Sequence, residues 1–385
     1  MIDIHQRAAA STPRDGPYGG SVLEQMPRSN SALDDAEMRW WQRWPAFAGY
    51  AALGWSLLYG VLGLYWSLSG AGFPFGRGND PQAALSILAD VRAETAAPII
   101  AGLGFLGSAV ALAMARGWGR GVVRVALLAF AWIAAVTLAL LIPDYRLLMA
   151  AAYIPLFVLG APFGWPPGSF FDVVTWPVLN QILCVAGGLC WAAAAVAYQH
   201  RTSDRTRPAR WTTPAAAARW GRWATAIAVL IPLFYAATRW AWALGIPLGI
   251  SEEFLREGQA IGLWWAGAGL ATVAVVGALL TLGLVQRWGE VFPGWLPIVG
   301  GKRVPPALAI VPATLVAILI TTAGLMFVRL TLLGEIGELF TFVGDEDWAA
   351  LAPELLWPLW GVALALATLA YFYRRRGPCP QRGRH

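Results

Sequence analysis

The sequence predicts an all-α polytopic membrane protein with eight transmembrane helices, arranged as two parallel four-helix repeats that each carry an outer interfacial partial helix. Three observations carry this prediction: the composition, eight long apolar stretches, and a set of short motifs that occurs twice. Of the residues, 58% are hydrophobic and 13% are charged, and the mean hydropathy is +0.55. Soluble domains have about 45–50% apolar and about 25% charged residues.

Eight apolar stretches are long enough to be spans, because about 20 apolar residues cross a bilayer. They lie at roughly 46–70, 97–115, 121–142, 176–198, 224–248, 260–286, 306–328 and 357–373. A further apolar segment, 147–163, could be taken for a ninth span. We reject that interpretation, because its counterpart in the second half carries five acidic residues and would be costly to place in lipid. We expect this segment to lie along the outer interface.

Short motifs recur in the same order in the two halves of the chain. The recurring pairs are Tyr59 with Tyr235, Trp66 with Trp242, Pro74 with Pro247, Arg146 with Arg329, and Trp176 with Trp357. Such a recurrence indicates a duplicated unit. Because each unit contains an even number of spans, both units are expected to insert in the same orientation, related by an axis along the membrane normal.

The two repeats are expected at 45–199 and 223–373. Residues 1–44 are rich in Ser, Pro, Gly and charge, which predicts a disordered cytoplasmic tail. Within the first 38 residues there is no apolar run that could serve as the core of a signal peptide. A basic cytoplasmic linker, 200–222, joins the repeats, and 374–385 forms a basic cytoplasmic tail.

Positive charge is distributed unevenly between the connecting segments. If both termini face the cytoplasm, 22 of the 28 Lys and Arg residues lie inside and five lie outside, with Arg239 inside a span. The positive-inside rule predicts this asymmetry. We therefore expect a multi-pass protein of the plasma (inner) membrane with a cytoplasmic N-terminus and C-terminus. The net charge of +6 follows from that topology, and nucleic acid is not an expected partner.

Two groups of motifs resemble a known family. The first is YWSLSG at 65–70 with WALG at 242–245, and the second is RLTLLGEIGELFTFVG at 329–344. Their order, with a small-residue second span between them, is similar to an uncharacterised family of four-span bacterial (actinobacterial) integral membrane proteins with a YWALGG-type motif. The resemblance covers about 45–373 and implies a tandem fusion of two such units. It implies no activity.

Arg239 is the most unusual residue of the chain, because it lies inside a predicted span. It is about ten residues from the outer end, hence about 15 Å deep at 1.5 Å per residue. An arginine at a helix centre costs roughly 2.5–3.5 kcal/mol on insertion scales, so it requires polar partners. The candidate ligand-binding residues are Arg239, Glu335, Glu338, Glu253, Tyr235 and Tyr59. The alternative is a structural ion pair, or an arginine that reaches toward the headgroups.

Most enzyme classes are disfavoured by the sequence. The three histidines lie outside the predicted spans, so no haem, di-iron or zinc site is expected in the membrane. The GxSxG, HExxH and P-loop patterns are absent. We expect no metal, no cofactor and no catalytic residue. An enzyme that acts on a lipid through the carboxylates of Glu335, Glu338, Glu354 or Asp172 is the third hypothesis.

Two hypotheses rank ahead of the enzyme. In the first, the protein binds or transports a small ligand at the interface of the two repeats, with Arg239 near the site. In the second, it is a non-catalytic accessory or scaffold protein whose partner is another membrane protein. A polar cavity that reaches Arg239 would favour the first hypothesis, whereas a closed ion pair at Arg239 would favour the second. In either case the lipid bilayer is a partner.

Overall fold

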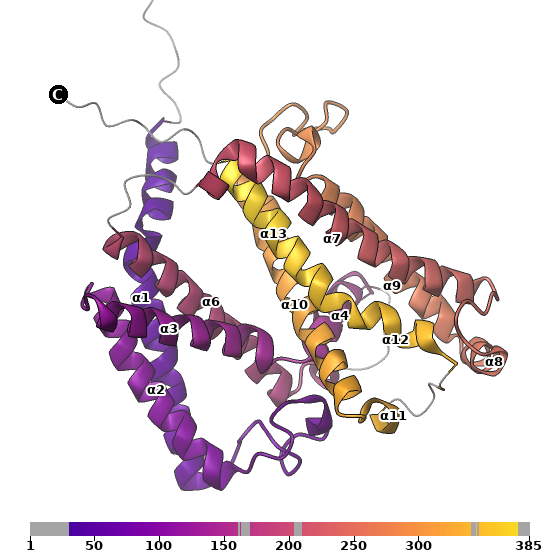
Figure 1. Ribbon diagram of the computed structural model, residues 1–385, viewed down its shortest axis with the longest axis horizontal. Coiled ribbons are helices and arrows are strands. Elements are labelled where there is room, and N and C mark those ends of the chain that lie inside the picture. The colour runs from indigo at the N-terminus through magenta and orange to yellow at the C-terminus, as the bar shows by residue number, and fades with distance from the viewer. Residues whose placement is uncertain are drawn as a thin grey trace, which may run out of the picture. The chain divides into compact units, whose positions relative to one another are not determined.

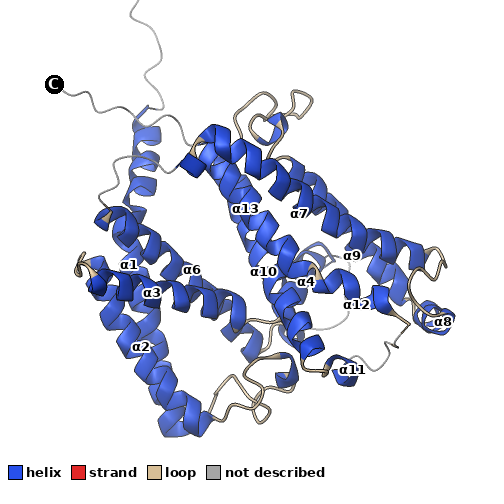
Figure 2. Cartoon of the chain, viewed as in Figure 1, coloured by secondary structure: helices blue, strands red, loops and turns tan. Residues whose placement is uncertain are grey.

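The computed structural model describes residues 31–160, 162, 170–203, 210–339, 344 and 346–375 (Figure 1). This part of the chain consists of helices and loops and contains no strand (Figure 2). By its contacts the chain divides into two compact units, Met1–Trp44 and Pro45–His385. The second unit contains the packed apolar helices.

Among the residues that the structure describes, eight helical segments are long and apolar enough to cross a membrane, in agreement with the predicted number. They run over Trp44–Ser69, Ala93–Ala115, Val122–Leu141, Trp176–Thr202, Pro214–Ala243, Leu263–Leu282, Pro306–Leu332 and Trp348–Arg375. The corresponding elements are α1 (Ser31–Ser69), α2 (Ala93–Ala115), α3 (Val122–Val136) with η2 (Thr137–Leu141), α6 (Trp176–Thr202), α7 (Pro214–Ala243), α9 (Leu263–Leu282), α10 (Pro306–Leu332), and α12 (Trp348–Leu355) with α13 (Trp357–Arg375).

Shorter elements connect the spans. They are η1 (Ala83–Leu85), α4 (Tyr145–Gly160), α5 (Phe170–Val173), η4 (Arg210–Thr212), α8 (Glu252–Ala260), η5 (Arg287–Gly289) and α11 (Ile336–Leu339). α4 is 16 residues long and does not belong to the eight spanning segments. The described part of 147–163 is therefore shorter than the candidate spans, and residues 161 and 163 lie outside the described residues.

Proline and capping residues determine where several helices begin. Pro177, Pro214 and Pro306 occupy the first turns of α6, α7 and α10, where a missing backbone N–H breaks no helical hydrogen bond. Thr213 caps α7, because its Oγ1 accepts the N–H of Ala216 at 3.4 Å. α6 and α10 begin at 176 and 306, as the sequence predicts, whereas α7 begins at Pro214, ten residues before the predicted 224 and within the predicted linker 200–222.

In the first half, α1 packs closely against α2 and α6 through glycines. A Cβ on Gly104 would come within 2.4 Å of the backbone N of Gly60, and a Cβ on Gly187 within 2.1 Å of the Trp55 ring. Lipid provides no hydrophobic drive between helices, so close approach at small residues is a main source of association. α3 packs against α6 on the other side.

The second half has the corresponding contacts. α7 packs against α9 and α13, and α10 packs against α13. A Cβ on Gly221 would lie 2.5 Å from Ala370 Cβ, and a Cβ on Gly324 would lie 2.4 Å from Pro358 Cδ. In each half, therefore, the first span contacts the second and fourth, and the third contacts the fourth.

The halves meet along α10, which contacts α4 and η2 of the first half. Leu85 of η1 packs with Phe327 and Leu330 of α10. Arg329 of α10 donates through Nη2 to the carbonyl O of Leu85 at 3.0 Å. The loop between α1 and α2 is therefore part of the contact between the halves.

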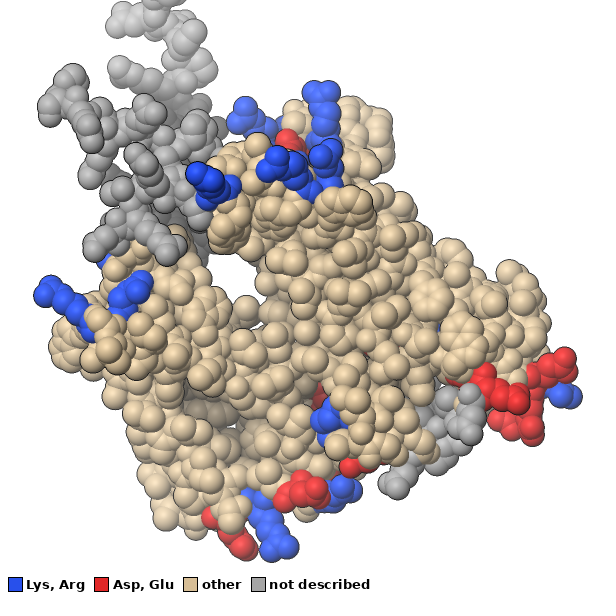
Figure 3. Space-filling view, viewed as in Figure 1, with Lys and Arg blue, Asp and Glu red and all other residues tan. Residues whose placement is uncertain are grey.

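The two ends of the helices differ in charge (Figure 3). Lys and Arg residues gather mainly at one end, drawn at the top, and Asp and Glu residues gather near the other. The start of α7 and the loop between α9 and α10 carry the exposed Arg210, Arg222, Lys302 and Arg303. This is the property on which the positive-inside rule depends.

Candidate functional site

Arg239 is buried on α7, where its guanidinium forms an ion pair with Glu354 of α12. Its Nη1 also donates to the carbonyl O of Ala349 at 3.0 Å. The rings of Tyr235 and Trp242 have their centroids 4.6 Å and 4.3 Å from Arg239 Cζ, within the range of a cation–π contact. Protein groups therefore enclose the guanidinium, and the arrangement is that of a closed ion pair.

The carboxylate partner of Arg239 is Glu354, whereas the sequence favoured Glu335, Glu338 and Glu253. Glu335 is half-buried just beyond the end of α10, and Glu253 is exposed in the first turn of α8. The side chain of Glu338 lies outside the described residues. Glu354 supplies the carboxylate because α12 packs against α7, and the spacing of charges along the sequence contains no information about that contact.

A second buried charge cluster lies in the first half, where η2 leads into α4. Arg146 Nη2 is 2.6 Å from Asp144 Oδ2, and Arg146 Nη1 is 2.9 Å from Asp80 Oδ2. Gln181 of α6 donates through Nε2 to Asp144 Oδ2 at 2.8 Å. Burial opposes the charged form of Arg146, but hydrogen bonds and negative charge from Asp144 and Asp80 raise its pKa above the ordinary value. The cluster therefore contains a permanent cation.

Arg146 and Arg329, which recur in the two halves of the sequence, bond differently. Arg146 binds carboxylates, whereas Arg329 donates to backbone carbonyls of η1. Sequence reasoning missed Asp80 and Asp144, because acidic residues in connecting segments are usually solvated. The available signal was Gln181, a polar residue inside the fourth span.

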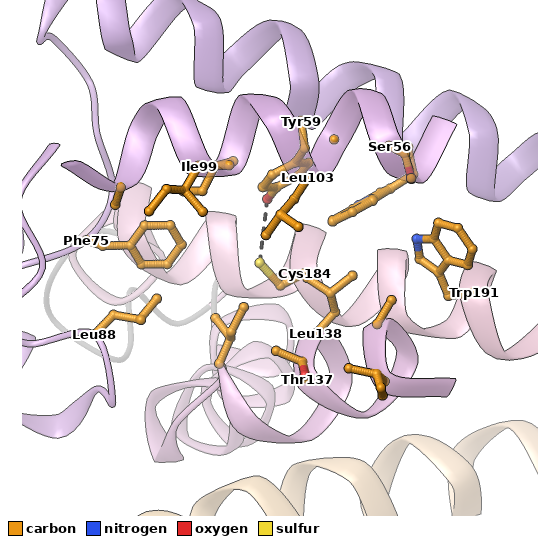
Figure 4. Close-up of a pocket in the computed structure, with 18 of the residues that line it drawn as sticks. Ser56, Tyr59, Phe75, Leu88, Ile99, Leu103, Thr137, Leu138, Cys184 and Trp191 are labelled. Atoms are coloured by element: carbon orange, nitrogen blue, oxygen red, sulfur yellow. Dashed lines mark hydrogen bonds between the residues drawn. The ribbon is translucent and has the colours of Figure 1, made fainter. Parts of the chain in front are cut away.

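An apolar cavity of about 430 Å³ lies inside the first half (Figure 4). Small-molecule sites have volumes of about 300–1,000 Å³. The walls come from four spans and include Trp55 and Tyr59 of α1, Leu103 of α2, Leu138 of η2 and Cys184 of α6. No charged residue belongs to the described lining. The cavity lies within one half of the chain, and Arg239 is not part of its wall.

The exposed residues of the cavity lining come from α2 and α3. Three of its lining residues are also among the exposed apolar residues: Ile99 and Leu103 of α2 are 62% and 54% exposed, and Ile133 of α3 is 67% exposed. All three belong to membrane-spanning segments. The exposed part of the lining is therefore apolar and comes from two candidate membrane spans.

Tyr59 provides a polar group in the cavity wall. Its hydroxyl donates to Asn180 Oδ1 at 2.8 Å and lies 3.6 Å from Cys184 Sγ (Figure 4). Ser56 and Thr137 bring two further hydroxyl groups to the lining. Tyr59 is thus a predicted site residue that the structure places at a cavity, although in the first half and away from Arg239.

A short π-helix forms part of the same wall. In η2 the N–H of Ile142 bonds to the carbonyl O of Thr137 at 3.0 Å, five residues earlier. Thr137, Leu138 and Ile142 all line the cavity. π-helical turns inside α-helices are rare and occur frequently at functional sites. Their presence beside the cavity supports a binding role for this region.

Replacing Tyr59 by Phe is expected to lower the free energy of unfolding by about 1 kcal/mol, because Asn180 Oδ1 loses its donor. The measurement is unfolding of the purified protein by SDS in mixed micelles. Tyr65→Phe is the matched control, because Tyr65 lies on the same helix and is 53% exposed. Equal stability of the two variants would contradict the importance of this hydrogen bond.

Comparison with known proteins gives no match: no protein family, no curated protein and no solved structure matches this chain. Within the described part of the chain, no group of three or more His, Cys, Asp or Glu residues is placed to hold a metal ion. The chemistry of the site therefore has to be inferred from its own geometry. A cavity whose described lining is uncharged and partly exposed can hold an apolar molecule and can offer it hydroxyl groups.

Proposed function

We propose that this multi-pass membrane protein binds an uncharged, mainly hydrocarbon ligand from the bilayer in the cavity of its first half. The observation that carries the proposal is the combination of a described lining without charged residues and exposed apolar lining residues that belong to candidate membrane spans. A charged ligand would lose its hydration in such a cavity without gaining an ion pair. A hydrocarbon chain has no hydration to lose, because it moves from one apolar surrounding to another.

Affinity in this cavity has to come from packing and hydrogen bonds, because transfer out of lipid supplies no hydrophobic gain. Trp55, Phe75 and Trp191 provide large apolar surfaces. The Tyr59 hydroxyl donates to Asn180 and retains acceptor capacity on its oxygen. A ligand with one hydroxyl group on a long apolar chain satisfies both requirements, so we infer a long-chain alcohol as the ligand class.

We also propose that the frame is a tandem pair of parallel four-span repeats, 45–199 and 223–373, related to the uncharacterised YWALGG-type family. The equivalent order of span contacts in the two halves supports the duplication. The concentration of Lys and Arg at one end of the spans supports cytoplasmic termini in a plasma membrane protein. In this frame the cavity is a property of the first repeat.

An accessory role fits this binding function better than transport at the repeat interface. Transport with Arg239 as the anchor would require its guanidinium to reach a ligand, but Glu354 and two aromatic rings enclose it. A lipid enzyme is also less favoured, because no carboxylate belongs to the described lining of the cavity. Ligand binding would then serve to stabilise the protein or its contact with another membrane protein.

A photoreactive ligand tests the proposal. The full chain is reconstituted in phosphatidylcholine vesicles with a long-chain alcohol that carries a diazirine, irradiated, and digested for mass spectrometry. We expect labelled peptides from α2, α3 and η2. Ala134→Phe should reduce that labelling by roughly tenfold, since overpacking of a filled site costs about 1–3 kcal/mol. Ala134 lines the cavity.

Ala129→Phe is the matched control, because it adds the same ring to an exposed position of α3 that does not line the cavity. Its labelling should equal that of the unmodified protein. Labelling spread over all lipid-facing helices, or unchanged by Ala134→Phe, would contradict the proposal.

A further inference from the structure

The loop between α9 and α10 is a structured hairpin. Val291 and Arg303 form an antiparallel bridge at its base. The N–H of Phe292 donates to the carbonyl O of Lys302 at 3.0 Å, and the N–H of Gly301 donates to the carbonyl O of Phe292 at 3.0 Å. We call residues 291–303 the hairpin loop. Its backbone hydrogen bonds hold its tip in one arrangement.

The base of the hairpin loop is fastened to α13. Tyr371 donates its hydroxyl to the carbonyl O of Gly289 at 2.7 Å, and Arg375 Nη2 donates to the carbonyl O of Val304 at 2.7 Å. Val304 is buried. The last turn of the last span therefore sets the position of the loop at the end of the membrane helices.

The tip of the hairpin loop presents apolar side chains to the outside. Trp295 is 80% exposed and Ile298 is 90% exposed. Ile298 has a φ of 73°, a conformation that β-branched residues rarely adopt. Contact of this isoleucine side chain with water does not stabilise the protein. Backbone strain of this kind is concentrated at functional positions. The tip is thus shaped to contact an apolar or amphipathic surface.

Basic residues lie at the base of the hairpin loop and at the start of α7. Lys302 and Arg303 are exposed at the base of the hairpin loop. Arg219 and Arg222 are exposed on the first turns of α7, at the same end of the spans, where Trp223 is 76% exposed. Figure 3 shows Lys and Arg gathered at this end. Positive charge beside exposed Trp residues is the pattern of an element that lies at a membrane surface.

We propose that the hairpin loop binds anionic phospholipid headgroups in the leaflet at the basic end, with Trp295 and Ile298 inserted among them. Lys302 and Arg303 supply the charge that selects an anionic headgroup over a zwitterionic one. The loop joins two span ends, so the headgroup layer is the surface closest to it. The proposal does not depend on the cavity of the first half.

Photo-crosslinking from position 298 tests this proposal. The full chain with p-benzoylphenylalanine in place of Ile298 is reconstituted in phosphatidylcholine vesicles that contain phosphatidylglycerol, irradiated, and examined for lipid adducts. We expect phosphatidylglycerol adducts in excess of its proportion in the vesicle. The double substitution Lys302→Gln and Arg303→Gln should reduce that excess, by about fivefold for each basic residue removed.

Arg256→Gln in the same photoreactive chain is the matched control, because it removes one exposed charge on α8, before α9 rather than after it. It should leave the phosphatidylglycerol excess unchanged. Absence of lipid adducts at position 298 would overturn the proposal, as would an excess that persists in the double variant. Adducts formed only with another protein in native membranes, with none in vesicles, would also overturn it.

Discussion

Arg146→Met is expected to lower the free energy of unfolding by about 3–5 kcal/mol, because it leaves the carboxylates of Asp80 and Asp144 buried without their cation. All three side chains are less than one-tenth exposed. Loss of the Arg146 guanidinium should also detach the loop between α1 and α2 from α4, because the ion pair between Asp80 and Arg146 joins the two. Unfolding by SDS in mixed micelles, followed by circular dichroism, measures the effect.

Arg77→Met is the matched control for this prediction. Arg77 also pairs with an aspartate in the loop between α1 and α2, but its side chain is 64% exposed. Surface ion pairs add little to stability, so this variant should unfold like the unmodified protein. If Arg146→Met and Arg77→Met have the same stability, the buried cluster does not hold the first half together.

Arg239→Leu has the second large expected effect. It should lower the free energy of unfolding by about 3–5 kcal/mol, because Glu354 is left buried without its partner. The double variant Arg239→Leu, Glu354→Leu should recover most of this loss. Apolar residues of similar volume can replace a buried ion pair at little cost in stability. The same SDS titration of the two single variants and the double variant gives the coupling free energy.

The outcome at Arg239 separates two interpretations of this residue. A large coupling between Arg239 and Glu354 means that the arginine has a structural role. If Arg239→Leu keeps the stability of the unmodified protein, the ion pair is not structural, and the hypothesis of Arg239 as a ligand anchor becomes the better one. Glu354→Leu as a single variant should be as destabilised as Arg239→Leu.

The eight spans could be predicted because hydropathy is a local property of the sequence. A run of about 20 apolar residues is sufficient to identify a span, and no knowledge of its neighbours is needed. Segment 147–163 was excluded from the predicted spans for a different reason, because its hydropathy alone would allow it to be one. Its counterpart in the second half contains acidic residues that lipid does not accommodate.

The polar contacts could be predicted only in part. A buried Arg239 had to have a carboxylate partner, but the choice of Glu354 depends on the packing of α12 against α7. Asp144 lies just past the end of a span, where its burial depends on α4 and on Gln181 of α6. Such contacts bring together residues far apart in the sequence, and no local pattern specifies them.

The cavity could not be predicted at all, because its lining combines residues of α1, α2, α3, η2 and α6 that are far apart in the sequence. Tyr59 was selected as a motif shared by the two halves, and its hydrogen bond to Asn180 shows why its hydroxyl is retained at this depth. The halves share the tyrosine, but Tyr235 of the second half contacts Arg239. The two tyrosines therefore have different surroundings, so their recurrence in the sequence does not imply two equal sites.

Native mass spectrometry of the protein extracted in mild detergent tests the central claim, which is that the first half binds an uncharged apolar ligand. The unmodified protein and Ala129→Phe are expected to retain a single uncharged molecule with a long hydrocarbon chain, whereas Ala134→Phe should be recovered without it. Retention of the same molecule by Ala134→Phe, or its absence from all three proteins, would contradict the claim.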